Sequence, residues 1–150
     1  MQMISQGAFN INRGNYEGAY EVAAMVLETR EMLARLFHAE SSKQVVFTPG
    51  ITHSLNYLIK GLLEAGDRVI VTGMEHNGVM RPLFQMEEEG IICDVALTDI
   101  EGSVRPEEVE RLIRPETKAV LMLHASNVSG TVMPIEAIGA ICKEHNLFFA

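Results

Sequence analysis

Short apolar runs rich in β-branched residues alternate along this chain with segments of helical periodicity, and this alternation constrains the fold most. Such runs occupy residues 68–72, 91–97 and 119–123, and each is followed by a segment whose apolar residues recur at helical spacing. Neighbouring parallel strands need a crossover connection, which is usually a helix. The sequence therefore predicts an α/β fold of three layers, in which helices cover both faces of a mainly parallel sheet.

The same periodicity predicts the remaining elements. A long amphipathic helix is expected over residues 16–38, and a short strand over 45–48 leads through Pro49 and Gly50 into a helix beginning at Thr52. Further helices are expected over 79–89, from 106, and over 134–145, with another apolar run from 147. No repeat, low-complexity segment or linker interrupts residues 1–150, so one domain is expected.

Composition excludes several functional classes. The net charge is −8 and the acidic residues are spread along the chain, so a nucleic-acid partner would be repelled. The chain contains neither a basic segment followed by an apolar run at its start nor about 18 consecutive apolar residues, which predicts a cytoplasmic protein without a membrane contact. Cys93 and Cys142 lie in apolar patterns without CxxC spacing, so reduced core thiols and no metal site are expected.

Parallel sheets bind ligands at the carboxyl ends of their strands, which directs attention to three loops. The first, residues 48–52, combines a glycine with a hydroxyl at the start of a helix. Free amide groups and the helix dipole favour an anion there, so Gly50 and Thr52 are candidates for a phosphate cradle. The alternative is that Thr52 simply caps the helix. The loop matches neither a Walker sequence nor GxGxxG.

The other two loops contain side chains suited to a flat, polar ligand. In residues 73–78, His76 can stack on a ring or carry a proton, the alternative being a surface histidine near a helix start. In residues 124–131, Asn127 can bind a hydroxyl or phenolate oxygen, or else satisfy the backbone of its own turn. His124 is interpreted as a histidine satisfied at the strand end. His76 with Glu75 lacks the partners of a metal site.

Four motifs together resemble one known family. They occupy residues 10–14, 48–52, 74–77 and 124–131, in an order and spacing similar to the class V aminotransferases. The match is best with the NifS-like cysteine desulfurase branch, whose members are fold type I enzymes that depend on pyridoxal phosphate. This resemblance extends over essentially all 150 residues.

The resemblance implies roles for individual residues. Gly50, Ile51 and Thr52 are expected to bind the cofactor phosphate, with Ile51 contributing through its backbone only because its side chain departs from the family pattern. His76 is expected to stack on the pyridine ring and to carry protons, which makes it the catalytic candidate. Asn127 is expected to bind the phenolic oxygen of the ring.

The resemblance also implies what the whole protein does. Residues 1–150 are expected to be part of the large cofactor-binding domain, lacking its C-terminal part, the small domain, the ring-pairing aspartate and the Schiff-base lysine. The chain alone is therefore expected to be inactive. A homodimer acting on cysteine or a related amino acid is expected, with a sulfur-acceptor protein as partner and Arg13 near the partner's site. A non-catalytic binding or interaction module and an unrelated nucleotide-binding domain remain alternatives.

Overall fold

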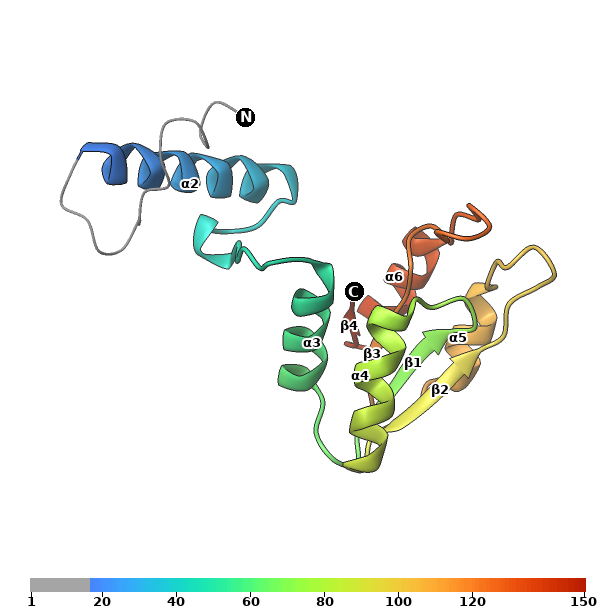
Figure 1. Cartoon of the computed structure of the whole chain (residues 1–150). Helices are drawn as coiled ribbons and strands as arrows, with labels where there is room; N and C mark the ends of the chain where they lie inside the picture. Colours follow the sequence, from blue (N-terminus) through green and yellow to red (C-terminus); the bar gives the residue numbers. More distant parts are fainter. Residues whose placement is uncertain (1–16) are drawn as a thin grey trace. The chain divides into compact units, whose positions relative to one another are not determined.

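A computed structural model describes residues 17–150 of the chain (Figure 1). The chain divides into two compact units, the first ending at Phe47 and the second running from Thr48 to Ala150. The motif at residues 10–14, including Arg13, lies outside the described residues.

The first unit consists mainly of one long helix. Helix α2 (Glu17–Leu36) confirms the amphipathic helix predicted over residues 16–38. It is followed by a short 3-10 helix, η1 (Ser42–Gln44), whose N-terminus is closed by a capping box between Ser41 and Gln44. Reciprocal side-chain bonds of this kind satisfy two backbone donors that would otherwise lack partners.

The strand predicted over residues 45–48 is not formed, so this prediction was wrong. Val46 is 72% exposed and Phe47 is 49% exposed. β-branched composition favours extended backbone, but a strand also requires a neighbour with which to exchange hydrogen bonds. Among the described residues no segment pairs with this run. Composition alone could not reveal the missing partner.

The second unit contains the predicted alternation of helices and strands. Its four strands are all parallel and lie in the order β2-β1-β3-β4, which confirms the α/β fold. Each strand and helix predicted after residue 50 is present, with ends that differ by a few residues. The elements are α3 (Ile51–Leu62), β1 (Arg68–Thr72), α4 (Asn77–Glu88), β2 (Ile92–Ala96), α5 (Pro106–Leu112), β3 (Thr117–Leu121), α6 (Ile135–Glu144) and β4 (Phe148–Phe149).

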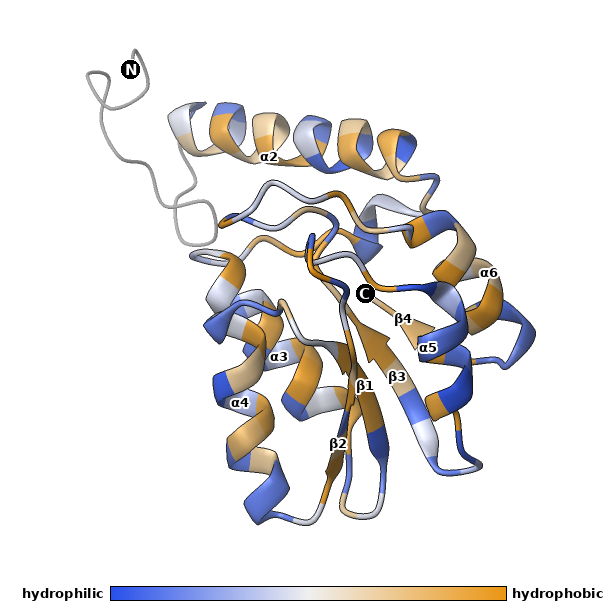
Figure 2. Cartoon of the chain, turned by 90° about the vertical axis from the view of Figure 1, so that its right-hand side faces the viewer, coloured by the Kyte–Doolittle hydropathy of each residue, from blue (hydrophilic) through white to orange (hydrophobic). Residues whose placement is uncertain are grey.

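Helices cover both faces of this sheet, which gives the three layers expected (Figure 2). Successive side chains of a strand point to opposite faces. Val69 and Val71 of β1 accordingly belong to the apolar cluster that includes α3 and α4, whereas Ile70 belongs to the cluster that includes α5 and α6. All three are completely buried. A near-continuous apolar run is what a strand covered on both faces requires.

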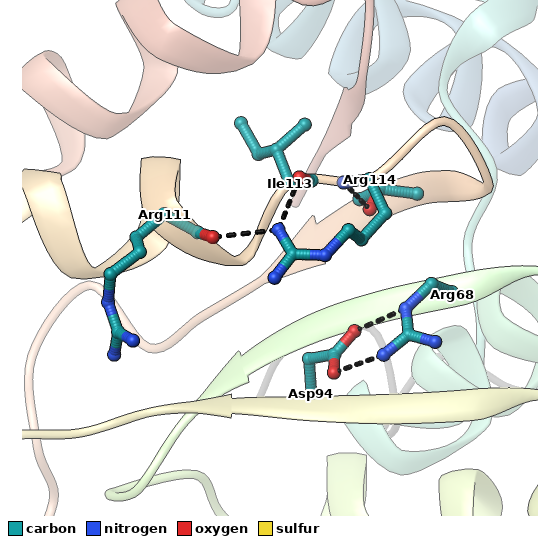
Figure 3. A network of polar contacts seen from close by, with 6 residues as sticks. Arg68, Asp94, Arg111, Ile113 and Arg114 are labelled. Carbon is teal, nitrogen blue, oxygen red and sulfur yellow. Dashed lines mark hydrogen bonds and ion pairs between the residues drawn. The ribbon is translucent and has the colours of Figure 1, made fainter.

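Polar contacts between protein groups hold the region where β1 and β3 begin (Figure 3). Arg68, the first residue of β1, donates two hydrogen bonds to Asp94 of β2, at 2.8 and 2.6 Å. In the loop before β3, the Arg114 guanidinium donates to the carbonyl oxygens of Arg111 and Ile113. These contacts lie at the amino end of the sheet, opposite the end at which the ligand loops are predicted.

The cysteine prediction leads to a measurable expectation. Both cysteines are free, and burial raises the pKa of the Cys93 thiol to about 12, with Glu87 and Asp94 adding to the shift. The thiolate is the reactive form, and relative to the ordinary pKa of 9.0 its population near neutral pH falls roughly a thousandfold. We expect iodoacetamide to label Cys93 very slowly at pH 8 in the native protein, and faster as pH rises. Mass spectrometry of the peptide that contains Cys93 measures the labelling rate in native protein and in protein unfolded in urea. Equal labelling rates in the two states would contradict the prediction.

Candidate functional site

A cavity of about 630 Å³ lies at the carboxyl end of the sheet in the second unit. It is formed by the start of α3, the loop between β1 and α4, and the segment that follows β3. Its walls are mainly apolar, with a few polar side chains among them. The lining residues are Ile51, Thr52, Ser54, Leu55, Leu58, Glu75, His76, Gly78, Val79, Leu121, Met122, Leu123, His124, Asn127 and Ala150.

Four of the five residues predicted for the site line this one cavity. Ile51, Thr52, His76 and Asn127 come from three separate segments of the chain and meet there. Gly50 does not line the cavity, but it is the residue that immediately precedes α3. The structure also brings His124 to the same cavity, where the sequence had suggested only a strand-end residue.

The start of α3 is open to an anion. Gly50 is the N-cap and provides no side-chain hydrogen bond, so the amides of Ile51 and Thr52 have no acceptor among the described residues. Thr52 is the second helical residue rather than the cap, which means that the capping interpretation of Thr52 was wrong. Thr52 is exposed and lines the cavity, and its hydroxyl makes no hydrogen bond to another described residue. This combination suits a phosphate group.

No internal contact accounts for a glycine at position 50. Its φ of 168° is extended backbone that any residue adopts. A Cβ atom added there would meet nothing within 4 Å. Neither local conformation nor protein packing therefore requires glycine, whereas the close approach of a ligand to the backbone would.

His76 is an exposed residue at a helix start, as the alternative interpretation has it, and it also lines the cavity. It is the N-cap of α4, where its Nδ1 accepts a 2.9 Å hydrogen bond from the Gly78 amide. A nitrogen that accepts carries no proton, so the neutral ring bears its proton on Nε2. A side chain at position 78 would crowd this cap, because an added Cβ would lie 3.1 Å from Nδ1 and 3.4 Å from Leu55. The cap fixes one nitrogen and leaves Nε2 for a ligand.

The Asn127 side chain does not accept the backbone amides of its own turn. The buried Ser126 performs that function, since its hydroxyl accepts hydrogen bonds from the amides of Val128 and Ser129, each at 3.2 Å. The Asn127 side chain is exposed and bonds no other described residue. The backbone-satisfying interpretation of Asn127 was therefore wrong, and its amide is available to a molecule in the cavity.

Glu75 is the lining residue whose importance the sequence did not reveal. One of its oxygens, Oε1, accepts hydrogen bonds from the Thr72 hydroxyl at 2.6 Å and from the Leu123 amide at 3.0 Å. The other, Oε2, is buried and has no hydrogen-bond partner among the described residues. Burial raises the pKa of Glu75 above its ordinary value. In the sequence, the only indication that Glu75 belongs to the site was its position beside His76, just past a buried strand.

Two further contacts connect the loops at this end of the sheet. Thr131, in the segment after β3, donates through its hydroxyl to the carbonyl oxygen of Glu101, in the loop after β2. That loop turns at Gly102, whose φ is 82°, and a Cβ there would lie 3.1 Å from the Met74 side chain. The positive φ is what favours glycine at 102, because the Met74 side chain is flexible and could move aside.

The helices of residues 17–150 do not combine the length and hydropathy that crossing a lipid bilayer requires. Within the same residues, no three His, Cys, Asp or Glu side chains gather as a metal site would need.

A family model for class-V aminotransferases matches residues 1–150, the whole of the chain. The chain belongs to the class-V aminotransferase family. Among its curated relatives, a mitochondrial cysteine desulfurase of Eremothecium gossypii is 33% identical over 144 residues, which cover 93% of this chain and 29% of that protein. The cysteine desulfurase IscS of Dictyoglomus turgidum is 32% identical over 86% of this chain and 34% of its own length.

Solved structures of this family share the fold. A structure described as SspA in complex with cysteine has a TM-score of 0.84 and 29% identity, covering 94% of this chain and 42% of that one. The apo cysteine desulfurase from Thermococcus onnurineus also has a TM-score of 0.84, with 26% identity over 94% of this chain and 36% of that one. The chain thus spans about a third of the length of the relatives that it matches.

Proposed function

We propose that the full-length protein is a pyridoxal-phosphate-dependent cysteine desulfurase and that residues 1–150 are part of its large, cofactor-binding domain. The observation that carries this proposal is the meeting of Thr52, His76 and Asn127, from three separate segments, at one cavity. Family membership supports the use of pyridoxal phosphate, and the names of the relatives support the reaction.

The residues present fit that cofactor. The uncapped start of α3, with the Thr52 hydroxyl, would bind the phosphate, and the side-chain-free Gly50 would let the backbone approach it. The imidazole of His76 would lie against the ring, and the Asn127 amide would donate to its phenolic oxygen. When bound, pyridoxal phosphate supplies an electron sink for bond breaking at the α-carbon of an amino acid.

His76 has one nitrogen available for proton transfer. Nδ1 is occupied by the Gly78 amide, so Nε2 is the atom that would hold or release a proton beside the substrate. The mainly apolar walls of the cavity would exclude water from that exchange.

The proposal includes the substrate and the setting of the enzyme. Cysteine or a related amino acid is proposed as substrate, since the curated relatives are cysteine desulfurases and SspA is described in complex with cysteine. We further propose a cytoplasmic homodimer that passes sulfur to an acceptor protein. The described residues contain no helix long and apolar enough to cross a membrane, and this is compatible with the proposed location.

Turnover by the purified full-length protein tests the reaction. With pyridoxal phosphate, cysteine and a reducing thiol, we expect sulfide and alanine in equal amounts, together with the absorbance of the bound cofactor. Alanine formed without sulfide, or no cofactor absorbance, would contradict the proposal. Cofactor binding without any product would favour the non-catalytic module instead.

Thr52 offers a direct test of the phosphate contact. Thr52→Ala removes a hydroxyl that would donate to a charged group, and such bonds contribute about 1.5–3 kcal/mol. We therefore expect cofactor affinity to fall roughly tenfold or more in the full-length protein, measured by titration of cofactor absorbance. Thr52→Ser, which keeps the hydroxyl, is the matched control and should bind within a few-fold of the parent. Equal weakening in both variants would refute a hydroxyl contact.

A further inference from the structure

The Glu75 side chain joins the two loops that contain the proposed ring contacts. Glu75 precedes His76 in the loop after β1, and its Oε1 accepts the amide of Leu123, in the segment that leads from β3 to Asn127. The same oxygen accepts the hydroxyl of Thr72, the buried last residue of β1. The carboxylate thus connects the end of β1 to the segment after β3.

The bond between Glu75 and Leu123 lies just beyond the end of the hydrogen-bond ladder between β1 and β3. The backbone ladder between β1 and β3 ends at the pair Val71 and Leu121. Leu123 lies just past that pair, so its amide can no longer bond to β1, and the Glu75 oxygen replaces the missing backbone acceptor. This bond therefore continues the connection between the two segments beyond the end of the ladder.

From this geometry we infer that Glu75 is a positioning residue, which holds the loop containing His76 against the segment leading to Asn127 before any ligand binds. The inference rests on the proposed cofactor site and adds to it a residue that contacts protein groups at the wall of the cavity.

The inferred role requires an acceptor oxygen rather than a negative charge. Both donors are satisfied by Oε1 alone, while no described residue bonds the buried Oε2. Burial also raises the pKa of Glu75, which favours its neutral form relative to an exposed glutamate. Glutamine offers the same acceptor at nearly the same place, whereas alanine offers none. The two substitutions therefore separate geometry from charge.

The test uses the full-length protein with Glu75→Gln, Glu75→Ala and the control Glu89→Ala, which changes an exposed residue at the end of α4. Two quantities are measured: the dissociation constant for pyridoxal phosphate, and amide hydrogen exchange in the peptide containing Leu123 without cofactor. We expect Glu75→Gln and Glu89→Ala to stay within about threefold of the parent in both quantities. For Glu75→Ala we expect roughly tenfold weaker binding and faster exchange.

The outcomes separate this inference from the proposed function. Unchanged cofactor affinity in Glu75→Ala, even with lower thermal stability, would overturn the positioning role, and so would equal losses in Glu75→Gln and Glu75→Ala. If the parent protein binds no pyridoxal phosphate, the proposed function fails, while the exchange measurement still reports on the contact. Should Glu75→Ala not fold, Glu75→Asp, one methylene shorter, should show the weakened binding, and parent-like affinity there would overturn the inference.

Discussion

On the proposed function, replacing His76 with alanine is expected to lower the kcat of the full-length protein by roughly 10²–10⁴-fold, the usual contribution of a positioned acid or base. The substitution removes the Nε2 proton and the ring surface proposed to lie against the cofactor. It also removes the bond from the Gly78 amide that caps α4. Steady-state desulfurase assays across pH, with cofactor saturating, measure the loss.

A second substitution separates the two functions of His76. Asparagine is a favourable N-cap, so His76→Asn should keep the start of α4 while removing the imidazole. We expect its thermal stability to stay near that of the parent and its kcat to fall as far as in His76→Ala.

His53 provides the matched control, because it is an exposed histidine of α3 that does not line the cavity. His53→Ala should leave kcat within about twofold of the parent. An active His76→Asn enzyme would show that His76 serves only as a helix cap.

Replacing Leu83 with alanine is expected to lower the free energy of unfolding by about 2–5 kcal/mol. Leu83 is completely buried on α4 and belongs to the apolar cluster shared by α3, α4 and β1. Shortening it leaves a cavity that close-packed neighbours refill only in part. Urea unfolding of the full-length protein without cofactor, followed by circular dichroism, measures the change.

The neighbouring Phe84 is the control for this prediction. Its side chain is 55% exposed, so Phe84→Ala removes a similar kind of group from the outer side of the same helix. We expect it to cost less than about 1 kcal/mol. Equal destabilisation by the two variants would contradict the assignment of Leu83 to the core.

Most elements of the second unit were predictable because their patterns are local. The run at residues 68–72 is both β-branched and apolar, which is typical of a strand buried on two faces, and β1 has those bounds. The run at 45–48 has similar composition but no described partner, so it forms no strand. Strand propensity belongs to a segment, whereas strand pairing depends on residues elsewhere in the chain.

The candidate site was likewise predictable from the sequence only in part. Thr52, His76 and Asn127 could be selected from the sequence because each follows a predicted strand or begins a helix, where parallel sheets bind ligands. Contacts excluded the capping interpretation of Thr52 and the turn interpretation of Asn127. Ser126 rather than Asn127 satisfies its turn, and Gly50 rather than Thr52 is the N-cap. Glu75 could not be singled out, because its partner Leu123 is distant in sequence.

The sequence by itself determined the alternation of strands and helices, because the spacing of apolar residues decides which backbone can bury them. It also placed polar loops where the strands end. Only the tertiary structure decided the strand order, the cavity shared by the loops and the bond from Glu75 to Leu123. These depend on hydrogen bonds and packing between segments far apart in the chain, and no local pattern of residues specifies such contacts.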